Sequence, residues 1–430
     1  MASTPVKKNW TVMVYLAGDN NLDGAGVVDL KEMKKVGSTS GINILAQFDR
    51  QGAGVHTKRY FIKKGGSLEQ DVVADLGETN TGDPQILQDF ITWGATKYPA
   101  DHYLVVVWNH GAGWDDTNIY RAVNRTLKLD VVRKNAVAAH ARGGALGVVS
   151  SHQLRAVSDR RFRRALFGTT VASAIRTRAI AFDDNAKDFL DNLEMKRLLA
   201  SAKKSLKQKI DILGMDACLM SMVEVGYQVR DSVTYTVGSE QVEPGEGWPY
   251  DTILAELAKK PTMSPSDLSK VIVKKYLASY SPAVPVTQSA FDLTRSDAMA
   301  TAIDQFAKTL ISHLSDTAAR AAMLTARNQV QTYEVPDYVD LVDFAKLLQA
   351  QTTIPALKTA CQNVMDAARV GQFVVASGYK GSAMAGSNGV SIYFPTRKIS
   401  PLYAKLDFVQ QTTWDEFLRA YIAATTRRPV

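Results

Sequence analysis

The sequence contains only two cysteines, and one of them, Cys218, follows a short apolar run and stands two residues after Asp216 in ILGMDACLMS. Another apolar run, LVVVW, is followed by His110 in the glycine-rich turn NHGAGW. A thiol is a strong nucleophile only as the thiolate, and a nearby imidazole lowers its pKa and supplies a proton to the leaving group. The pattern indicates cysteine catalysis with Cys218 as nucleophile and His110 as general acid/base. The alternative is that Cys218 is a small hydrophobic residue of the core.

The two apolar runs are predicted to be strands buried on both faces, because apolar residues are consecutive in them rather than alternating. In doubly wound sheets, functional groups gather at the carboxyl ends of strands near a topological switch point. If the two strands are neighbours, His110 and Cys218 face one another. Gly111 and Gly113 would then let a substrate approach closely and aim backbone N–H groups at a developing oxyanion.

Strands alternate with helices along the first part of the chain, which predicts an α/β fold with a mainly parallel sheet and helices on both faces. A helix is expected from Pro84 onward, since Asp83 is a capping residue and proline suits the first helical position. From about residue 261 the pattern becomes helical, with one late strand, GVSIYFP. We therefore expect a core over residues 1–260, interrupted by an insertion at 117–178, and a mostly helical region over 261–430 that completes or covers it.

Composition excludes several classes of protein. With 430 residues, 46% hydrophobic and 22% charged, the chain is neither disordered nor fibrous. No apolar run approaches the length needed to span a bilayer, and the N-terminus is a poor secretion signal, so cytoplasmic residence is the default expectation and export stays open. Two cysteines are too few for a disulfide scaffold, and the six histidines lack metal-ligand spacing. The chemistry is expected to need no cofactor.

The basic charge is concentrated in one segment. The net charge is +8, but Thr117–Arg178 alone carries thirteen Lys or Arg and two acidic residues, so the rest of the chain is slightly acidic. This segment is interpreted as an insertion with three alternative roles: an exposed, cleavable restraint, a basic arm for an acidic partner, nucleic acid or a membrane surface, or a solvated loop. Aromatic residues for base stacking are nearly absent from it, which disfavours nucleic acid.

Six blocks of the sequence resemble, in order, the signature blocks of the clostripain-like cysteine peptidases, relatives of the caspases, legumains and gingipains. The blocks are WTVMVYLAGDNNLD, VVVWNHGAGW, AIAFDD, ILGMDACLMSMVEVGYQVRD, GSEQVEPGEGWPYD and GVSIYFP. The resemblance covers most of the chain outside the basic insertion. It implies a caspase-like three-layer αβα sandwich and an endopeptidase that cleaves after Arg or Lys through a thioester acyl-enzyme.

Residue by residue, the resemblance implies His110 as general acid/base, Cys218 as nucleophile, and the N–H groups of Gly111 and Cys218 as oxyanion donors. Asp216 would be the acid at the floor of the S1 pocket. A buried, unpaired carboxylate is costly, so a guanidinium or ammonium that pairs with it is favoured over neutral side chains. The alternative role of Asp216 is that of a strand-end or helix-capping residue.

Relatives of this type process themselves into two chains between the histidine and cysteine blocks. A peptidase that selects Arg or Lys, and carries an arginine-rich insertion there, is expected to cut itself. The candidate bonds follow Arg142, Arg155, Arg164, Arg176 or Arg178. The competing hypothesis is a weakly catalytic or non-catalytic relative, in which a caspase-like domain binds basic segments and the basic arm contacts an acidic partner or nucleic acid.

Other residues have two interpretations each. Asp19 and Asn20 shape the site or end a strand, and Trp248 and Tyr250 line a substrate groove or pack the core. Cys361 stands in a helical context and is expected to be structural. Relatives of this type can require calcium. Five acidic residues either supply oxygen ligands for a calcium ion or lie in a solvated loop. These residues are Asp183, Asp184, Glu240, Glu243 and Glu246.

Overall fold

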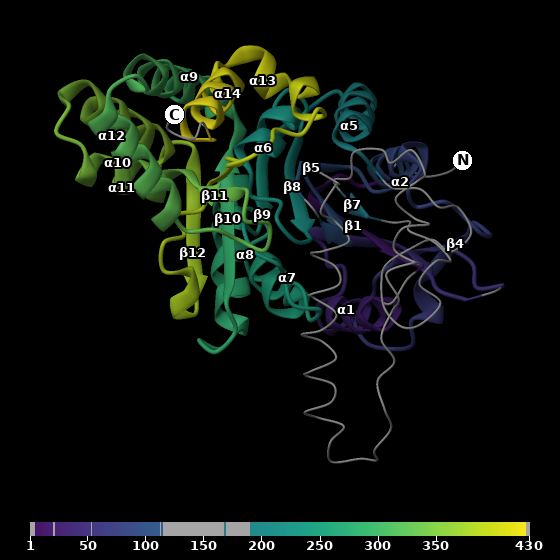
Figure 1. The fold of residues 1–430 in the computed structure, drawn as a ribbon. Coiled ribbons are helices and arrows are strands. Elements are labelled where there is room, and N and C mark those ends of the chain that lie inside the picture. The colour runs from purple at the N-terminus through teal and green to yellow at the C-terminus, as the bar shows by residue number, and fades with distance from the viewer. Residues whose placement is uncertain are drawn as a thin grey trace, which may run out of the picture.

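The computed structural model describes residues 5–19, 22–52, 54–111, 113–114, 167–168 and 190–426, and for residues 110, 167 and 168 only the backbone. Within these ranges nine strands form one central sheet (Figure 1). From one edge to the other they are β12 (Val374–Lys380), β10 (Val286–Asp292), β9 (Val233–Gly238), β8 (Ile210–Asp216), β5 (Ala100–Trp108), β1 (Lys8–Gly18), β2 (Ile42–Arg50), β3 (Lys58–Phe61) and β4 (Val72–Asp75).

The middle of the sheet is parallel and both margins are antiparallel. Strands β9, β8, β5, β1 and β2 pair in parallel, whereas β12 and β10 on one side and β3 and β4 on the other are antiparallel. Parallel neighbours need a crossover, and a helix follows β1 and another precedes β5. The prediction of an α/β fold with a mainly parallel sheet is confirmed for its central strands.

Helices cover both faces of the sheet, which gives three layers. One core contains side chains of α1 (Asp23–Val36), α7 (Tyr250–Lys259) and α8 (Pro265–Ser279). The other, larger core contains side chains of α2 (Pro84–Lys97), α5 (Asn192–Leu206), α6 (Val223–Val229), α9 (Ser296–His313), α10 (Thr317–Gln329), α11 (Leu341–Gln351), α12 (Pro355–Ala368), α13 (Asp407–Gln411) and α14 (Trp414–Thr426).

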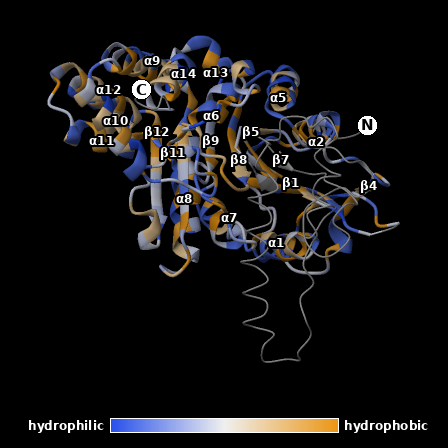
Figure 2. Ribbon diagram, viewed as in Figure 1, coloured by the Kyte–Doolittle hydropathy of each residue, from blue (hydrophilic) through white to orange (hydrophobic). Residues whose placement is uncertain are grey.

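Strand β1 shows why both faces are covered. Its successive side chains enter opposite cores: Val12, Val14 and Leu16 pack with α1 and α7, while Met13 and Tyr15 pack with α2. Such alternation along the apolar run VMVYLA requires a helical layer on each side. Figure 2 shows the resulting concentration of hydrophobic residues in the central strands.

Helix α2 begins where the sequence predicts. The Asp83 carboxylate accepts a hydrogen bond from the Gln85 N–H at 2.8 Å, and Pro84 occupies the first helical position. This cap satisfies a donor that the helix itself leaves unpaired. Among the described residues, no helix is both long enough and apolar enough to cross a membrane.

The C-terminal half adds strands as well as helices. Strands β10 and β12 extend the central sheet, and β11 (Tyr338–Asp340) pairs with β13 (Ser391–Tyr393) in a small sheet. The sequence indicated only the strand in GVSIYFP. Strand β10 was missed because its Thr287, Gln288 and Ser289 are polar yet buried, and hydrogen bonds such as Ser239 Oγ to Thr287 Oγ1 at 2.9 Å stabilise them there.

Candidate active site

The two turns that carry His110 and Cys218 follow neighbouring strands. Trp108 at the end of β5 pairs with Asp216 at the end of β8, and the Asn109 N–H donates to the Asp216 carbonyl at 3.3 Å. The short strand β6 (His110–Gly111) pairs with β7 (Phe167–Gly168). The backbone therefore brings the His-Gly segment to the turn that carries Cys218. The His110 side chain lies outside the described part of the chain, so its pairing with Cys218 stays a prediction.

Gly111 lies against the backbone of Cys218. A Cβ added at Gly111 would come within 2.2 Å of the Cys218 carbonyl oxygen and 2.9 Å of the Cys218 nitrogen. Neither contact is sterically possible, and both involve backbone atoms that side-chain rotation cannot move away. The closeness of the two residues suits their predicted role as a pair of oxyanion donors, since their N–H groups also face the sulfur.

The substitution Gly111→Ala is expected to lower kcat about a hundredfold or more, because the added methyl displaces the Cys218 turn by a large fraction of an ångström. Steady-state kinetics on a peptide substrate measures this. The matched control is Gly24→Ala in α1, at an exposed position where an added Cβ meets nothing within 4 Å. The control should retain activity; an active Gly111→Ala enzyme would contradict the close packing.

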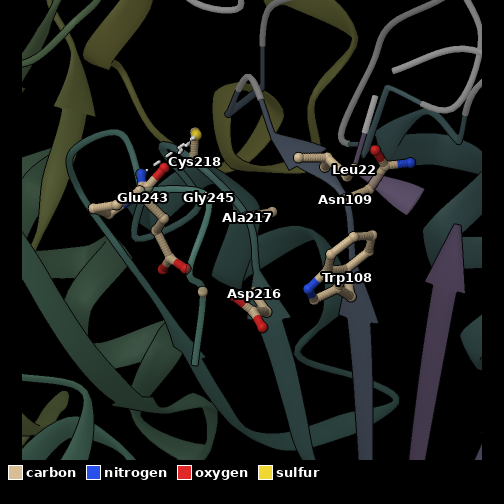
Figure 3. Close-up of a pocket in the computed structure, with 10 residues that line it drawn as sticks. Leu22, Trp108, Asn109, Asp216, Ala217, Cys218, Glu243 and Gly245 are labelled. Atoms are coloured by element: carbon tan, nitrogen blue, oxygen red, sulfur yellow. Dashed lines mark hydrogen bonds between the residues drawn. The ribbon is translucent and has the colours of Figure 1, made fainter. Parts of the chain in front are cut away.

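The Cys218 thiol is buried, and its burial opposes ionisation. Its side chain is 6% exposed, and the Glu243 N–H donates to Sγ at 3.4 Å (Figure 3). Burial raises the pKa of the thiol to about 12, and the N–H groups of Glu243 and Gly111 oppose that rise only in part. A thiol of this kind needs a base to become a nucleophile. An imidazole on the adjacent β6 segment is the residue type that would serve.

The residue after Cys218 is held in an unusual conformation. Leu219 has a φ of 64°, in the left-handed region that non-glycine residues rarely adopt. Its N–H donates to the Gln241 carbonyl at 3.3 Å, and its side chain is fully buried. The surroundings thus impose a strained turn that fixes the direction of the Cys218 side chain, as is common at functional sites.

A small cavity of about 30 Å³ lies beside Cys218, between the ends of β5 and β8 and the loop 243–247. Asp216 lies on one side of it, where its carboxylate accepts hydrogen bonds from Tyr250 Oη at 2.8 Å and from the Trp248 N–H at 3.3 Å. Figure 3 shows the Glu243 side chain extending from beneath Cys218 toward Asp216. Two carboxyl groups thus converge in one buried cavity next to the thiol.

The electrostatics of this cavity are unfavourable without a cation. Burial raises the pKa of Asp216 to about 6, and burial together with the Asp216 charge raises the pKa of Glu243 well above its usual range. In the described ranges no Lys or Arg forms an ion pair with either carboxyl, and Glu243 Oε2 meets no hydrogen-bond donor. The pair therefore holds a proton at neutral pH, or exchanges it for a positive charge from outside.

Glu243 is the residue whose role the sequence did not single out. It appeared there only as one of three glutamates in an acidic loop. The structure separates the three: Glu243 faces Asp216, Glu240 accepts a hydrogen bond from Tyr333 Oη at 2.7 Å in a different cluster, and Glu246 lines another cavity together with Glu32. Only the loop conformation distinguishes them, and no local sequence signal encodes it.

The remaining predicted residues divide between core and site. Trp248 and Tyr250 are buried, and Tyr250 also binds Asp216 directly. Asp19 is buried just after β1, and Cys361 is a buried free cysteine of α12. No group of three metal-ligating side chains occurs in the part of the chain that the structure describes. The other predicted positions lie outside it: Asn20, Arg142, Arg155, Arg164, Arg176, Arg178, Asp183 and Asp184.

Comparison with known proteins adds to this geometry. The model of the clostripain family matches residues 14–146 and 168–421. Clostripain of Hathewaya histolytica is 27% identical in an alignment of 271 positions, which covers 56% of this chain and 41% of that protein. The matched region therefore spans less than half of that relative.

Solved structures share the fold. A secreted C11 cysteine protease from Bacteroides thetaiotaomicron, bound to an irreversible peptide inhibitor, matches with a TM-score of 0.63 at 21% identity, over 95% of this chain and 99% of that one. An inactive zymogen C11 protease from Parabacteroides distasonis matches with a TM-score of 0.61 at 19% identity, over 95% and 99%. At these identities the likeness concerns the fold alone, and it confirms the caspase-like α/β architecture.

Proposed function

Because this chain belongs to the clostripain family of cysteine peptidases, we propose that it is an endopeptidase that cleaves after arginine or lysine. The observation that carries the specificity is the buried pair Asp216 and Glu243, which lies beside Cys218 and has no positive partner in the described residues. A guanidinium or ammonium entering the cavity would supply that partner. A neutral side chain would leave one or both carboxyl groups protonated and unpaired.

The proposed reaction uses the residues around this cavity. Cys218 Sγ attacks the scissile carbonyl carbon while His110 takes the thiol proton, and the N–H groups of Gly111 and Cys218 bind the oxyanion. The C–N bond then breaks, His110 donates the proton to the departing amine, and a thioester remains. Water, deprotonated by His110, attacks the thioester, releases the new carboxylate and restores the thiol.

The cavity must widen to accept a basic side chain. Its volume of about 30 Å³ is small for an arginine side chain, since one water molecule alone needs about 10–15 Å³. The wall that can move is the loop 243–247, where Gly247 has a φ of 56° and packs close to the Asp216 carboxylate. We infer that substrate entry shifts this loop and, with it, the Glu243 N–H that contacts Cys218 Sγ at 3.4 Å.

The test is a series of fluorogenic peptides identical except for the residue before the scissile bond, which is Arg, Lys, Asp or Leu. The proposal expects turnover of the Arg and Lys peptides only. Each peptide is measured with calcium and with a chelator, because relatives of this type can require calcium. Equal cleavage of the Leu peptide, or cleavage after Asp alone, would refute the specificity.

The pKa of Asp216 predicts a pH dependence of substrate binding. Burial raises that pKa from 3.8 to about 6, so acidification below about pH 6 neutralises the carboxylate that pairs with the substrate. KM for an arginyl peptide should therefore rise as the pH falls through this range. Initial rates across this pH range measure the change in KM.

The same pKa shift predicts how stability depends on pH. Between pH 3.8 and about 6 the folded protein holds more protons on Asp216 than the unfolded chain does, so the free energy of unfolding should fall as the pH rises through this range. Urea unfolding at several pH values measures this.

We further propose that the uncut chain is a precursor that activates itself within 117–178. The buried thiol, whose pKa is raised to about 12, and the narrow cavity support a latent single chain. The experiment is the intact mass of wild-type and Cys218→Ala protein after incubation. Wild-type fragments ending at one of the five candidate arginines, absent from the variant, are expected. A wild-type chain that stays uncut and is fully active would favour the basic-arm alternative.

A further inference from the structure

A second and larger cavity lies on the other side of the sheet's centre, against helix α2, strand β3 and the segment that follows β4. Its volume is about 590 Å³, far more than that of the cavity beside Cys218. Apolar side chains of Leu76, Ile86 and Trp93 form part of its lining, and threonine hydroxyl groups form another part. No step of the proposed peptide cleavage uses this cavity.

Arg59 of β3 is the buried cation in this cavity. It is 9% exposed, its Nε donates to Gln47 Oε1 at 2.8 Å, and its guanidinium lies 4.9 Å from the ring centre of Trp93. These contacts fix the plane of the guanidinium but use only one of its five N–H groups. Throughout the described ranges, the two terminal nitrogens make no hydrogen bond and Arg59 forms no ion pair.

The two terminal nitrogens of Arg59 keep some solvent exposure, so they are available to a negative group that enters the cavity. The nearest candidate inside the protein is Asp89, which is exposed, contributes only a longer-range attraction, and accepts its own hydrogen bond from Gln85 Nε2 at 2.7 Å. With Lys97 also in the lining, the charged side chains of the cavity sum to one excess positive charge. The cavity is thus matched to an anion with an apolar body.

We propose that this cavity binds an acidic segment of a peptide chain, with a side-chain carboxylate paired to the terminal nitrogens of Arg59. The planar guanidinium suits bidentate pairing with a carboxylate. Lys97 adds attraction at the rim, and the ring of Trp93 packs the apolar neighbours of the acidic residue. No residue of the catalytic cavity takes part.

The distance between this cavity and Asp216 sets the shortest substrate that could contact both. This point rests on the proposed peptidase function. Four inter-strand steps separate β8 from β3 in the sheet, which corresponds to about 19 Å at the usual strand spacing. An extended peptide covers that span in about six residues. This lateral distance is a lower limit, because the two cavities face different helical layers, so a tripeptide held at Asp216 does not reach Arg59.

Direct binding tests the proposal independently of cleavage. The probe is a fluorescein-labelled hexapeptide that contains two glutamates and one phenylalanine and lacks Arg and Lys, so it cannot occupy the Asp216 cavity as proposed. Its glutamine counterpart is the control ligand, and the protein is the full-length Cys218→Ala variant. Fluorescence anisotropy should show about tenfold or more tighter binding of the glutamate peptide, as expected for charge-assisted hydrogen bonds.

Two variants locate the site. Arg59→Met removes the guanidinium, and Thr92→Glu keeps it but places a carboxylate in the cavity lining, where it competes with the peptide. Each should weaken glutamate-peptide binding about tenfold or more, and Thr92→Glu should not lower the unfolding midpoint. The control Lys31→Met removes an exposed positive charge from α1 and should leave binding unchanged. Equal binding of the two peptides, or full binding by a folded Thr92→Glu variant, would overturn the proposal.

Discussion

The substitution Cys218→Ala is expected to lower kcat for an arginyl peptide by about 10⁴-fold or more, because no other group can form the acyl-enzyme. Folding should survive the change. Among the described residues, the Cys218 thiol forms two weak hydrogen bonds with the Glu243 backbone, accepting from the N–H at 3.4 Å and donating to the carbonyl at 3.9 Å. Steady-state kinetics and the urea unfolding midpoint separate loss of catalysis from loss of structure.

The matched control for this prediction is Cys361→Ala. Cys361 is the other cysteine of the chain, is fully buried in α12, and has a pKa raised to about 12 by burial. Its removal should leave kcat unchanged and cost a little stability through a small cavity. Comparable activity loss in both variants would indicate that unfolding, rather than a missing nucleophile, explains the result for Cys218.

The substitution Asp216→Asn is expected to lower kcat/KM for an arginyl peptide by about 10² to 10³-fold, since truncating one side of a buried charge pair costs several kcal/mol. The change is nearly isosteric, and the amide oxygen of the new side chain can still accept the Tyr250 hydroxyl, which lies 2.8 Å from the native carboxylate. The free energy of unfolding should not fall, because a buried and unpaired acid is removed. The pH dependence of KM near pH 6 should also disappear in this variant, because the carboxyl group that titrates there has been removed.

Glu243→Gln tests whether the second carboxyl contributes. Only its Oε1 has a hydrogen-bond partner in the described chain, namely Gln288 Nε2 at 3.4 Å, and a glutamine preserves that acceptor. We expect a loss of about tenfold in kcat/KM for arginyl peptides, smaller than for Asp216 because one carboxylate remains. A loss as large for a leucyl peptide would mean that Glu243 supports the loop and not the specificity.

Local sequence patterns predicted the elements that hold the catalytic residues. Strand β5 contains the uninterrupted apolar run LVVVW and β8 contains the run ILGM, and α2 carries its cap and proline, so each element could be identified from a few adjacent residues. The adjacency of β5 and β8 was only a condition of the sequence argument, suggested by where functional groups gather in parallel sheets, and the structure shows that the two strands pair. Strand β10 could not be identified this way, because its polar residues are satisfied by partners far along the chain.

The electrostatic features of both cavities depend on contacts between distant residues. Asp216 meets Glu243 and Tyr250 only after β8, β9 and α7 are packed together. Arg59 meets Trp93 and Gln47 from three separate elements, and nothing in KRYF distinguishes it from an exposed arginine of an edge hairpin. Burial of a charged group is a property of the folded chain that its sequence neighbours do not reveal.

Covalent labelling tests directly whether Cys218 is the nucleophile and whether the cavity beside it selects arginine. The reagent is a peptide chloromethyl ketone that ends in arginine, and the adduct is located by peptide mapping with mass spectrometry. We expect one adduct per chain, on Cys218 and not on Cys361. The matched leucyl reagent should label the protein much more slowly. We also expect Asp216→Asn to reduce the difference between the two reagents strongly, while Glu243 keeps a small part of it. Equal rates with both reagents in the wild type, or an adduct on Cys361, would contradict a cysteine nucleophile served by an acidic specificity pocket.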